Sequence, residues 1–375
     1  MAPLDVLIVG GGPAGATAAI LLARAGRSVA VLEKARFPRR KVCGEFVAPH
    51  AVQLLQELGF ENPGKVEIRR IALWAGNSIV GAALPPPYAR TIAREELDQL
   101  LLERAAAYGA RVFQPAAALR LERTPTGIAC IARPSLELEA RAIIAAHGSW
   151  EAGSLPTQPR HLPPQAADLL AFKAHFRGCG APPGTIALVP FPGGYAGVVE
   201  IDGGRATFAC CIRRERLEEL RTAGLPAGES AFRYALSMSR GMREAFEAAV
   251  REGPWLASGP LRPGARPLYC DGVFAVGNAA GEVHPVIGEG IAIAMSSARA
   301  LCQPLIAALE AGYPPEAQAA VAREYARRWQ RIFRRRHWSS ACFARLAMRP
   351  AAAAWANLAL RRTPSLLTLA ARLSS

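Results

Sequence analysis

Two side chains stand out because their chemistry would suit an active site. Cys43 follows five basic residues in the segment 34–41, and nearby cations favour the reactive thiolate over the thiol. His284 lies shortly before a glycine-rich turn, and a histidine can accept or donate a proton near neutral pH. A buried structural cysteine and a structural loop histidine would fit the same positions. The sequence therefore predicts both as candidate catalytic residues, provided that the fold brings them to one site.

The first 34 residues contain elements that could build such a site. The apolar run Val6–Val9 is followed by Gly10, Gly12 and Gly15 and then by an Ala/Leu-rich stretch. In a strand–turn–helix unit, the first glycine allows the tight turn and the second lets a pyrophosphate approach the backbone. The third lets the helix pack closely on the strand. Because the N-terminus of the helix also favours anions, this spacing predicts a dinucleotide-binding unit.

An acidic residue completes the pattern. The second apolar run, Val29–Leu32, ends at Glu33, which lies 18 residues after Gly15. This is close to the usual spacing of about 20 residues for the acid that binds a ribose hydroxyl. An acid at this position disfavours a 2′-phosphate. In the basic loop that follows, we expect Arg36, Arg39 and Arg40 to be solvated.

A second strand–glycine–helix unit occurs near residue 280. The apolar run Val273–Val276 precedes a loop and the long apolar segment Ile291–Leu309. The helix that starts near Glu289 would stabilise negative charge on a ligand. The glycines of this loop are Gly277, Gly281, Gly288 and Gly290.

Composition narrows the class of protein. The chain has 375 residues, 51% of them hydrophobic, enough for about two domains with substantial cores. Its eight cysteines show no C-x-x-C spacing, so we expect reduced thiols, a cytoplasmic protein and no metal site. We expect no secretory signal, and no charge-free apolar run reaches about 18 residues, so we expect no membrane-spanning helix.

Positive charge is concentrated near the C-terminus. The formal net charge is +15, and the segment 316–375 contains twelve arginines and two glutamates. Within it, arginines surround Trp329, Ile332 and Phe333, a composition typical of helices that bind an anionic membrane surface. A helix that packs on a core and exposes its arginines is the alternative. Nucleic-acid binding is not expected, because no groove of base-stacking aromatics is evident.

Three motifs in this order resemble those of FAD-dependent oxidoreductases with a p-hydroxybenzoate-hydroxylase-type fold. The glycine turn with Glu33 resembles their ADP-binding site. The helix Arg94-x-x-Leu97-Asp98-x-x-Leu101 and the segment 277–290 resemble their two other flavin-binding motifs. The segments K-V-C-G-E (41–45) and F-P-G-G-Y (191–195) are similar to motifs of the geranylgeranyl-reductase-like branch. Arg94 opens its helix, where a cation is unfavourable, so an anionic partner or a solvated side chain is expected.

The resemblance implies an α/β fold. A discontinuous Rossmann-like FAD-binding domain would comprise residues 1–70, 88–155 and 265–312. An inserted antiparallel-sheet substrate domain would comprise residues 71–87 and 156–264, with strands near 172–177, 186–191, 195–201 and 206–212 and a helix over 229–251. Basic amphipathic helices would form residues 313–375. The oligomeric state is not predicted.

The resemblance also implies site residues. FAD would be bound, with NADH or NADPH as the candidate reductant, and Cys43 would lie beside the flavin ring. The candidate catalytic residues are Cys43, His284 and Tyr195. The candidate cofactor-binding residues are Gly10, Gly12, Pro13, Ala14, Gly15, Glu33, Lys34, Lys41, Val42, Arg94, Gly277, Asn278, Gly281, Pro285, Gly288, Glu289 and Gly290.

Two positions depart from the family pattern. Asn278 replaces the aspartate that binds the ribityl chain, and from the sequence we expect that restoring Asp would tighten FAD binding. His147 replaces the aspartate of a D-G motif associated with flavin and NAD(P)H handling, which puts the reductant in question. The W-x-W-x-I-P motif of tryptophan halogenases is absent, which ranks halogenation low.

Three functions follow in order of preference. The first is reduction or dehydrogenation of a carbon–carbon bond in a small apolar substrate of prenyl, lipid or polyketide-like type. The second is hydroxylation of an aromatic or polyketide substrate by a flavin-dependent monooxygenase. The third is a non-catalytic module that binds a membrane surface or nucleic acid through the basic tail.

Overall fold

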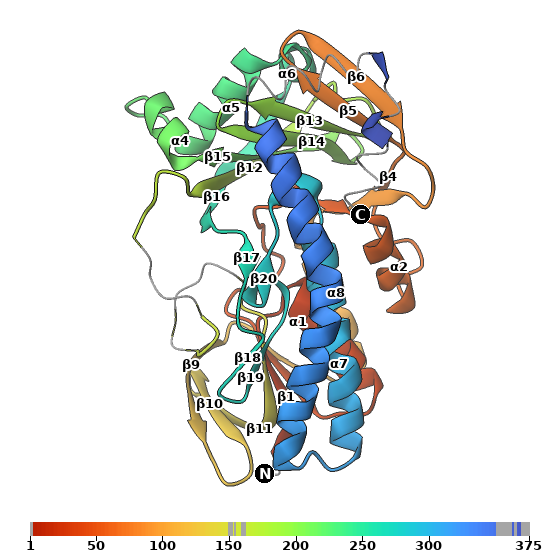
Figure 1. Cartoon of the computed structure of the whole chain (residues 1–375), viewed down its shortest axis with the longest axis vertical. Helices are drawn as coiled ribbons and strands as arrows, with labels where there is room; N and C mark the ends of the chain where they lie inside the picture. Colours follow the sequence, from red (N-terminus) through yellow and green to blue (C-terminus); the bar gives the residue numbers. More distant parts are fainter. Residues whose placement is uncertain are drawn as a thin grey trace.

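The computed structural model describes residues 3–148, 153, 155–158, 163–349, 362–363 and 366–368. Two large sheets lie toward opposite ends of the molecule, and the long helix α8 (Pro315–Ala347) runs from one toward the other (Figure 1). Most of the predicted C-terminal helical segment beyond residue 349 lies outside the described residues.

The first sheet is assembled from segments that are far apart in the sequence. Its central strand β1 (Leu4–Val9) pairs in parallel with its two neighbours, and the hairpin of β9 (Ala117–Arg123) and β10 (Ile128–Arg133) extends it through β11. β1 is buried on both faces, which explains its unbroken apolar run. The other strands are β2 (Val29–Leu32), β8 (Arg111–Phe113), β11 (Leu136–Ala145), β18 (Tyr269–Cys270) and β19 (Val273–Ala275).

Helices cover this sheet and form the largest hydrophobic cluster. α1 (Pro13–Arg24) packs against α3 (Arg94–Ala107) and α7 (Gly290–Glu310), and α7 also contacts α2 (Pro49–Glu57) and α8. Gly15 makes the close approach of α1 to β1 possible, since a Cβ there would lie 1.8 Å from the carbonyl oxygen of Gly10.

The second sheet is formed mainly by antiparallel strands. Its order is β16-β12-β15-β14-β13-β5-β6, in which β13 and β5 pair in parallel. One face packs on three helices, whereas the other faces the first domain; β12, for example, presents Phe172 and Phe176 to the helices. The strands are β5 (Arg70–Ala75), β6 (Ser78–Ala83), β12 (Leu169–Arg177), β13 (Thr185–Phe191), β14 (Gly194–Asp202), β15 (Arg205–Arg213) and β16 (Val250–Leu261).

Short elements join the two sheets. The strands β3 (Phe46–Val47), β4 (Val66–Ile68) and β7 (Ala89–Thr91) form one small sheet, and β17 (Gly264–Ala265) and β20 (Gly281–Glu282) form another. Two single-turn helices, η1 (Gly277–Ala279) and η2 (Pro285–Ile287), shape the second glycine loop. The predicted α/β architecture is confirmed, and the exact domain boundaries stay a prediction.

The predicted helix over 229–251 is wrong in its extent. Helix α4 (Arg214–Leu220) precedes this region. Within it the chain forms α5 (Ala227–Met238) and α6 (Arg240–Phe246), and β16 begins at Val250. Ser239 breaks the helix because its backbone is extended, and its hydroxyl accepts a hydrogen bond from the Met242 N–H at 3.3 Å. This is an N-cap that starts α6.

Helix α7 is long and apolar enough, by length and composition, to cross a membrane. However, 67% of its most apolar stretch is buried inside the protein, where it packs against α1 and α8. The core helix of a soluble domain has the same properties, so this helix is weak evidence for a membrane span.

Helix α8 corrects one expectation about the basic tail. Trp329 is 3% exposed and Phe333 is 5% exposed, and their rings stack 4.8 Å apart in the core below α7. Ile332 is partly buried against the same cluster. These side chains therefore cannot be the membrane-facing set. The outward face of α8 carries arginines and Trp338, which is 72% exposed, and contact with an anionic membrane stays a prediction.

Candidate functional site

A cavity of about 1830 Å³ is lined by residues from both sheets. Its volume exceeds the range of roughly 300–1,000 Å³ that is usual for one small ligand. Both glycine turns line it, and so does the free face of the second sheet. The predicted site residues therefore meet at one place, except that Gly15, Gly281 and His284 lie behind its wall among the described residues.

The first glycine turn leaves room for a phosphate. Gly10 has a φ of +111°, and a Cβ there would collide with the carbonyl oxygen of Ala146. At Gly12, in contrast, an added Cβ would meet only the Arg39 guanidinium, 3.9 Å away. No side chain caps the start of α1 at Pro13. The N-terminal N–H groups of this helix are thus available to an anion.

Glu33 and Arg39 flank this space. Glu33 is 4% exposed and accepts hydrogen bonds from the N–H groups of Gly11, at 2.8 Å, and Ala35, at 2.9 Å. The Arg39 Nη2 atom lies 3.4 Å from the Glu33 carboxylate. Arg39 was expected to be solvated, yet its side chain is only 14% exposed, and its Nε and Nη1 have no hydrogen-bond partner among the described residues. In the sequence, only the position of Arg39 in the loop after the second strand could have indicated that it borders the cofactor site.

Arg94 has an anionic partner within its own helix. Its Nε and Nη2 each donate to the Asp98 carboxylate at 2.8 Å, and Asp98 is completely buried. This bidentate pair explains how a cation is tolerated at the start of α3. The family-like R-x-x-L-D sequence therefore builds an internal ion pair at the cavity wall.

The second glycine loop forms the opposite wall. Gly277 and Gly288 have φ values of +63° and +70°, and Gly288 packs against Phe46 so closely that a Cβ would lie 2.9 Å from its ring. Asn278 lines the cavity, and its Nδ2 donates to Glu282 at 3.2 Å. Pro285 and Gly290 also line the cavity.

Glu289 is buried at the start of α7, where it lines the cavity. Its Oε2 lies 3.4 Å from His50 and 3.3 Å from Arg336 of α8. Burial raises the pKa of Glu289 to about 7 although Arg336 opposes the shift, and burial together with Arg336 lowers the pKa of His50 to about 4. This wall is therefore close to a change of charge at neutral pH.

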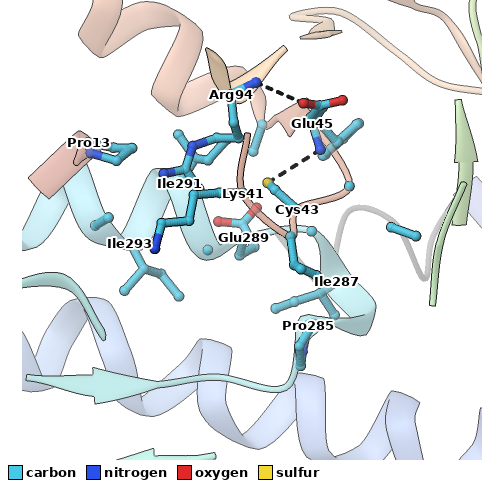
Figure 2. Close-up of a pocket in the computed structure, with 18 of the residues that line it drawn as sticks. Pro13, Lys41, Cys43, Glu45, Arg94, Pro285, Ile287, Glu289, Ile291 and Ile293 are labelled. Carbon is cyan, nitrogen blue, oxygen red and sulfur yellow. Dashed lines mark hydrogen bonds between the residues drawn. The ribbon is translucent and has the colours of Figure 1, made fainter. Parts of the chain in front are cut away.

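The loop that carries Lys41, Val42 and Cys43 lies between these walls. Figure 2 shows Glu45 next to Arg94 and Cys43, with the turn that carries Pro285 and Ile287 on the other side of Cys43. The Cys43 sulfur accepts a hydrogen bond from the Glu45 N–H at 3.3 Å. Burial, with help from neighbouring cations, lowers the pKa of Lys41. Lys34 is exposed at the cavity edge.

The second sheet contributes a mostly apolar wall. Side chains from β5, β13, β14 and β16 and from the end of α8 line it, and Gly197 leaves open space. Within this wall, the Tyr195 hydroxyl lies 3.1 Å from His284 Nδ1. The apolar side chains include Ile71, Leu73, Ile186, Leu188, Val199, Leu256, Phe343 and Leu346.

The structure bears on the charge state of His284, whereas its catalytic role stays a prediction. His284 is 6% exposed, and burial, with a contribution from Arg213, lowers its pKa to about 4. It is therefore neutral at pH 7 rather than titrating there. Burial raises the pKa of Tyr195, so its hydroxyl keeps its proton. Tyr195, not His284, reaches the cavity among the described residues.

Sequence reasoning missed a buried charge cluster around Glu45. Its carboxylate contacts Lys173 and His175 of β12 and Thr207 of β15. The K-V-C-G-E segment contained Glu45, but nothing in it showed which strands would meet that side chain.

These features fit FAD. Open space at Gly12 and the uncapped start of α1 suit a pyrophosphate, and the Arg39 guanidinium borders this space. Glu33 lines the cavity, where its carboxylate could accept a hydrogen bond from a ribose hydroxyl. Asn278 and the start of α7 line the opposite wall. The cavity has volume left for a second molecule.

Comparisons with known proteins agree with this geometry. A model of an FAD binding domain matches residues 3–161. The menaquinone reductase of Mycobacterium tuberculosis (strain H37Rv) is 34% identical over 159 residues, which is 39% of this chain and only 38% of the relative. Digeranylgeranylglycerophospholipid reductase 2 of Methanopyrus kandleri is 28% identical over 349 residues, covering 88% of this chain and 83% of the relative. The structure of the flavin-dependent brominase Bmp2 has a TM-score of 0.76 at 17% identity, covering 99% of this chain and 93% of that one.

The chain has the fold of p-hydroxybenzoate-hydroxylase-like flavoproteins, and its similarity to FAD-dependent reductases and monooxygenases supports an FAD-dependent enzyme. Within this class it is similar to geranylgeranyl-type reductases over most of its length. The predicted family and FAD binding are confirmed. The likeness to the brominase concerns the fold alone. The reductant and the roles of individual site residues stay predictions.

Proposed function

We propose that this enzyme uses FAD to reduce a carbon–carbon double bond in an apolar, prenyl-like substrate. The observation that carries the proposal is the second half of the cavity, where an apolar wall contains one buried Tyr195–His284 pair. Such a wall would bury a hydrocarbon chain and present the Tyr195 hydroxyl to it. Relatives named for reducing menaquinone and a digeranylgeranyl lipid support this choice of substrate class.

The residues of the chain would divide the work as follows. Reduced FAD, when bound, supplies a hydride to one carbon of the double bond. The Tyr195 hydroxyl, which is hydrogen-bonded to His284 Nδ1, would give a proton to the other carbon. Cys43 lines the boundary between the two halves and would shape the substrate position. The apolar wall would exclude water from the reacting carbons.

The test begins with the purified yellow protein. Anaerobic bleaching by NADH and by NADPH, measured separately, identifies the reductant. The reduced enzyme is then incubated with menaquinone and with geranylgeranyl lipids, and the products are weighed by mass spectrometry. We expect a gain of two hydrogens for each saturated bond. A gain of one oxygen under air would instead indicate a monooxygenase, and no turnover of either polyprenyl class would overturn the proposed substrate.

A further inference from the structure

Glu45 combines complete burial with an unusual backbone conformation. Its φ of +58° lies in the left-handed region, which non-glycine residues rarely adopt, and its side chain is only 1% exposed. A conformation of this kind persists only where surrounding contacts enforce it, and it occurs often at functional sites. The contacts of Glu45 should therefore explain why the chain keeps it.

Both carboxylate oxygens are fully engaged. Oε1 accepts a hydrogen bond from the Arg94 backbone N–H at 2.8 Å and contacts the Lys173 ammonium. Oε2 lies 2.9 Å from His175 Nε2 and accepts a hydrogen bond from the Thr207 hydroxyl. Burial would raise the pKa of Glu45, but the His175 hydrogen bond and the charge of Lys173 lower it to about 2. The carboxylate thus remains ionised at neutral pH.

These contacts join the two domains. Glu45 lies in the loop between β2 and β3 of the first domain, and Arg94 starts α3 of the same domain. Lys173 and His175 project from β12, and Thr207 is the register partner of His175 on β15. Lys173 also donates to the Lys41 carbonyl oxygen at 3.3 Å. The second sheet therefore contacts the loop on both sides of Cys43, at Lys41 and at Glu45.

We propose that Glu45 is a positioning residue that locks the 41–45 loop onto the second sheet and so sets where Cys43 lies in the cavity. The Glu45 N–H bonded to the Cys43 sulfur makes the link direct. Replacing the carboxylate would leave the Lys173 ammonium buried without its partner, which is unfavourable, and the loop would open. Any effect on turnover rests on the proposed function, but the position of Cys43 does not.

The test follows Cys43 in the FAD-loaded protein. The rate of maleimide addition to Cys43 is measured by peptide mass spectrometry, which separates it from the other cysteines. We expect Glu45→Gln to accelerate labelling roughly tenfold or more, because local opening exposes the sulfur. Thr207→Val, which removes a single contact and leaves the charges in place, should give a smaller acceleration in the same direction if Glu45→Gln does not fold.

Asp168→Asn is the matched control. Asp168 is a 3%-exposed carboxylate held by Arg262 at 2.7 Å in the second domain, and it does not itself line the cavity. This variant should lose stability while Cys43 labelling stays at the wild-type rate. Unchanged labelling in both Glu45→Gln and Thr207→Val, or equal acceleration in Asp168→Asn, would overturn the proposal.

Discussion

The two halves of the cavity are supplied by the chain in different ways. The half around Gly12, Glu33 and the 277–290 loop comes from short segments in which each functional residue lies close to its structural support. The half around Tyr195 comes from β5, β13, β14, β16 and α8, whose residues span positions 71–347. The first half holds several charges and the second is mainly apolar. The cofactor half thus depends on residues that are close together in the sequence. The substrate wall depends on how distant strands pair in the second sheet.

The difference between the two halves implies that a single change in the glycine turn should abolish FAD binding and leave the substrate half folded. Gly12→Asp should fold, because a Cβ meets only Arg39 at 3.9 Å, but its carboxylate would occupy the pyrophosphate space. We expect colourless protein with wild-type circular dichroism. Gly203→Asp is the control, since Gly203 also has open space at Cβ and lies outside the cavity. Folded and fully yellow Gly12→Asp protein would show that FAD does not use this turn.

Cys43 lies where the halves meet, so its removal should affect chemistry without affecting the cofactor. We expect Cys43→Ala to retain FAD and to lose roughly hundredfold in kcat, because the substrate would be held less accurately. Absorbance at the flavin band and turnover are measured on the same sample. Cys270→Ala is the control, because this half-buried cysteine does not line the cavity. Full turnover in Cys43→Ala would reduce the cysteine to a packing role.

His284 links the substrate half to pH. Its pKa is about 4 in the folded protein and about 6.5 when unfolded, so the unfolded chain binds more protons between these values. Its contribution to stability is complete above pH 6.5 and is lost as the pH falls toward 4. Between pH 7.5 and pH 5, wild type should lose about 2 kcal/mol of unfolding free energy relative to His284→Asn. If the urea midpoints of the two proteins changed equally between these pH values, the low pKa of His284 would be contradicted.

Asn278 tests the charge balance of the cofactor half. Its Nδ2 donates to Glu282 at 3.2 Å, so Asp at this position would place two carboxylates together. This contact reverses the expectation drawn from the family pattern. We expect Asn278→Asp to bind FAD roughly tenfold more weakly by titration. The double variant Asn278→Asp/Glu282→Gln should recover much of the loss, and tighter binding in the single variant would favour the original expectation.

The same contrast explains what could be predicted from the sequence. The glycine turn and Glu33 were readable because their function depends on spacing along one strand–helix unit. The Glu45 cluster was not, because His175 and Thr207 lie 130 and 162 residues away and meet it only through the pairing of β12 with β15. The low pKa of His284 depends on its burial and on the charge of Arg213, and both require the tertiary structure. The amphipathic character of α8 was evident from the sequence. Only the tertiary structure showed which of its aromatic side chains face the core.

The smallest expected effect concerns the outside of the substrate half. The last turns of α8 line this half through Phe343 and Leu346, while the outward face of the helix bears Trp338 among arginines. If this face rests on an anionic bilayer, an apolar substrate would reach the cavity from the lipid. Co-sedimentation should then require acidic lipid and decrease with salt.

Arg334→Gln sharpens this prediction, because each basic residue near an anionic surface contributes about 1 kcal/mol, or about fivefold in binding. Arg334 is exposed and has no ion-pair partner among the described residues. Arg123→Gln on β9 carries the same charge change at an exposed site away from α8 and should bind vesicles like wild type. A single-stranded oligonucleotide is tested in parallel. The prediction that α8 binds an anionic membrane would be contradicted by equal pelleting with neutral lipid or by equal losses in both variants. Binding to the oligonucleotide alone would contradict it too.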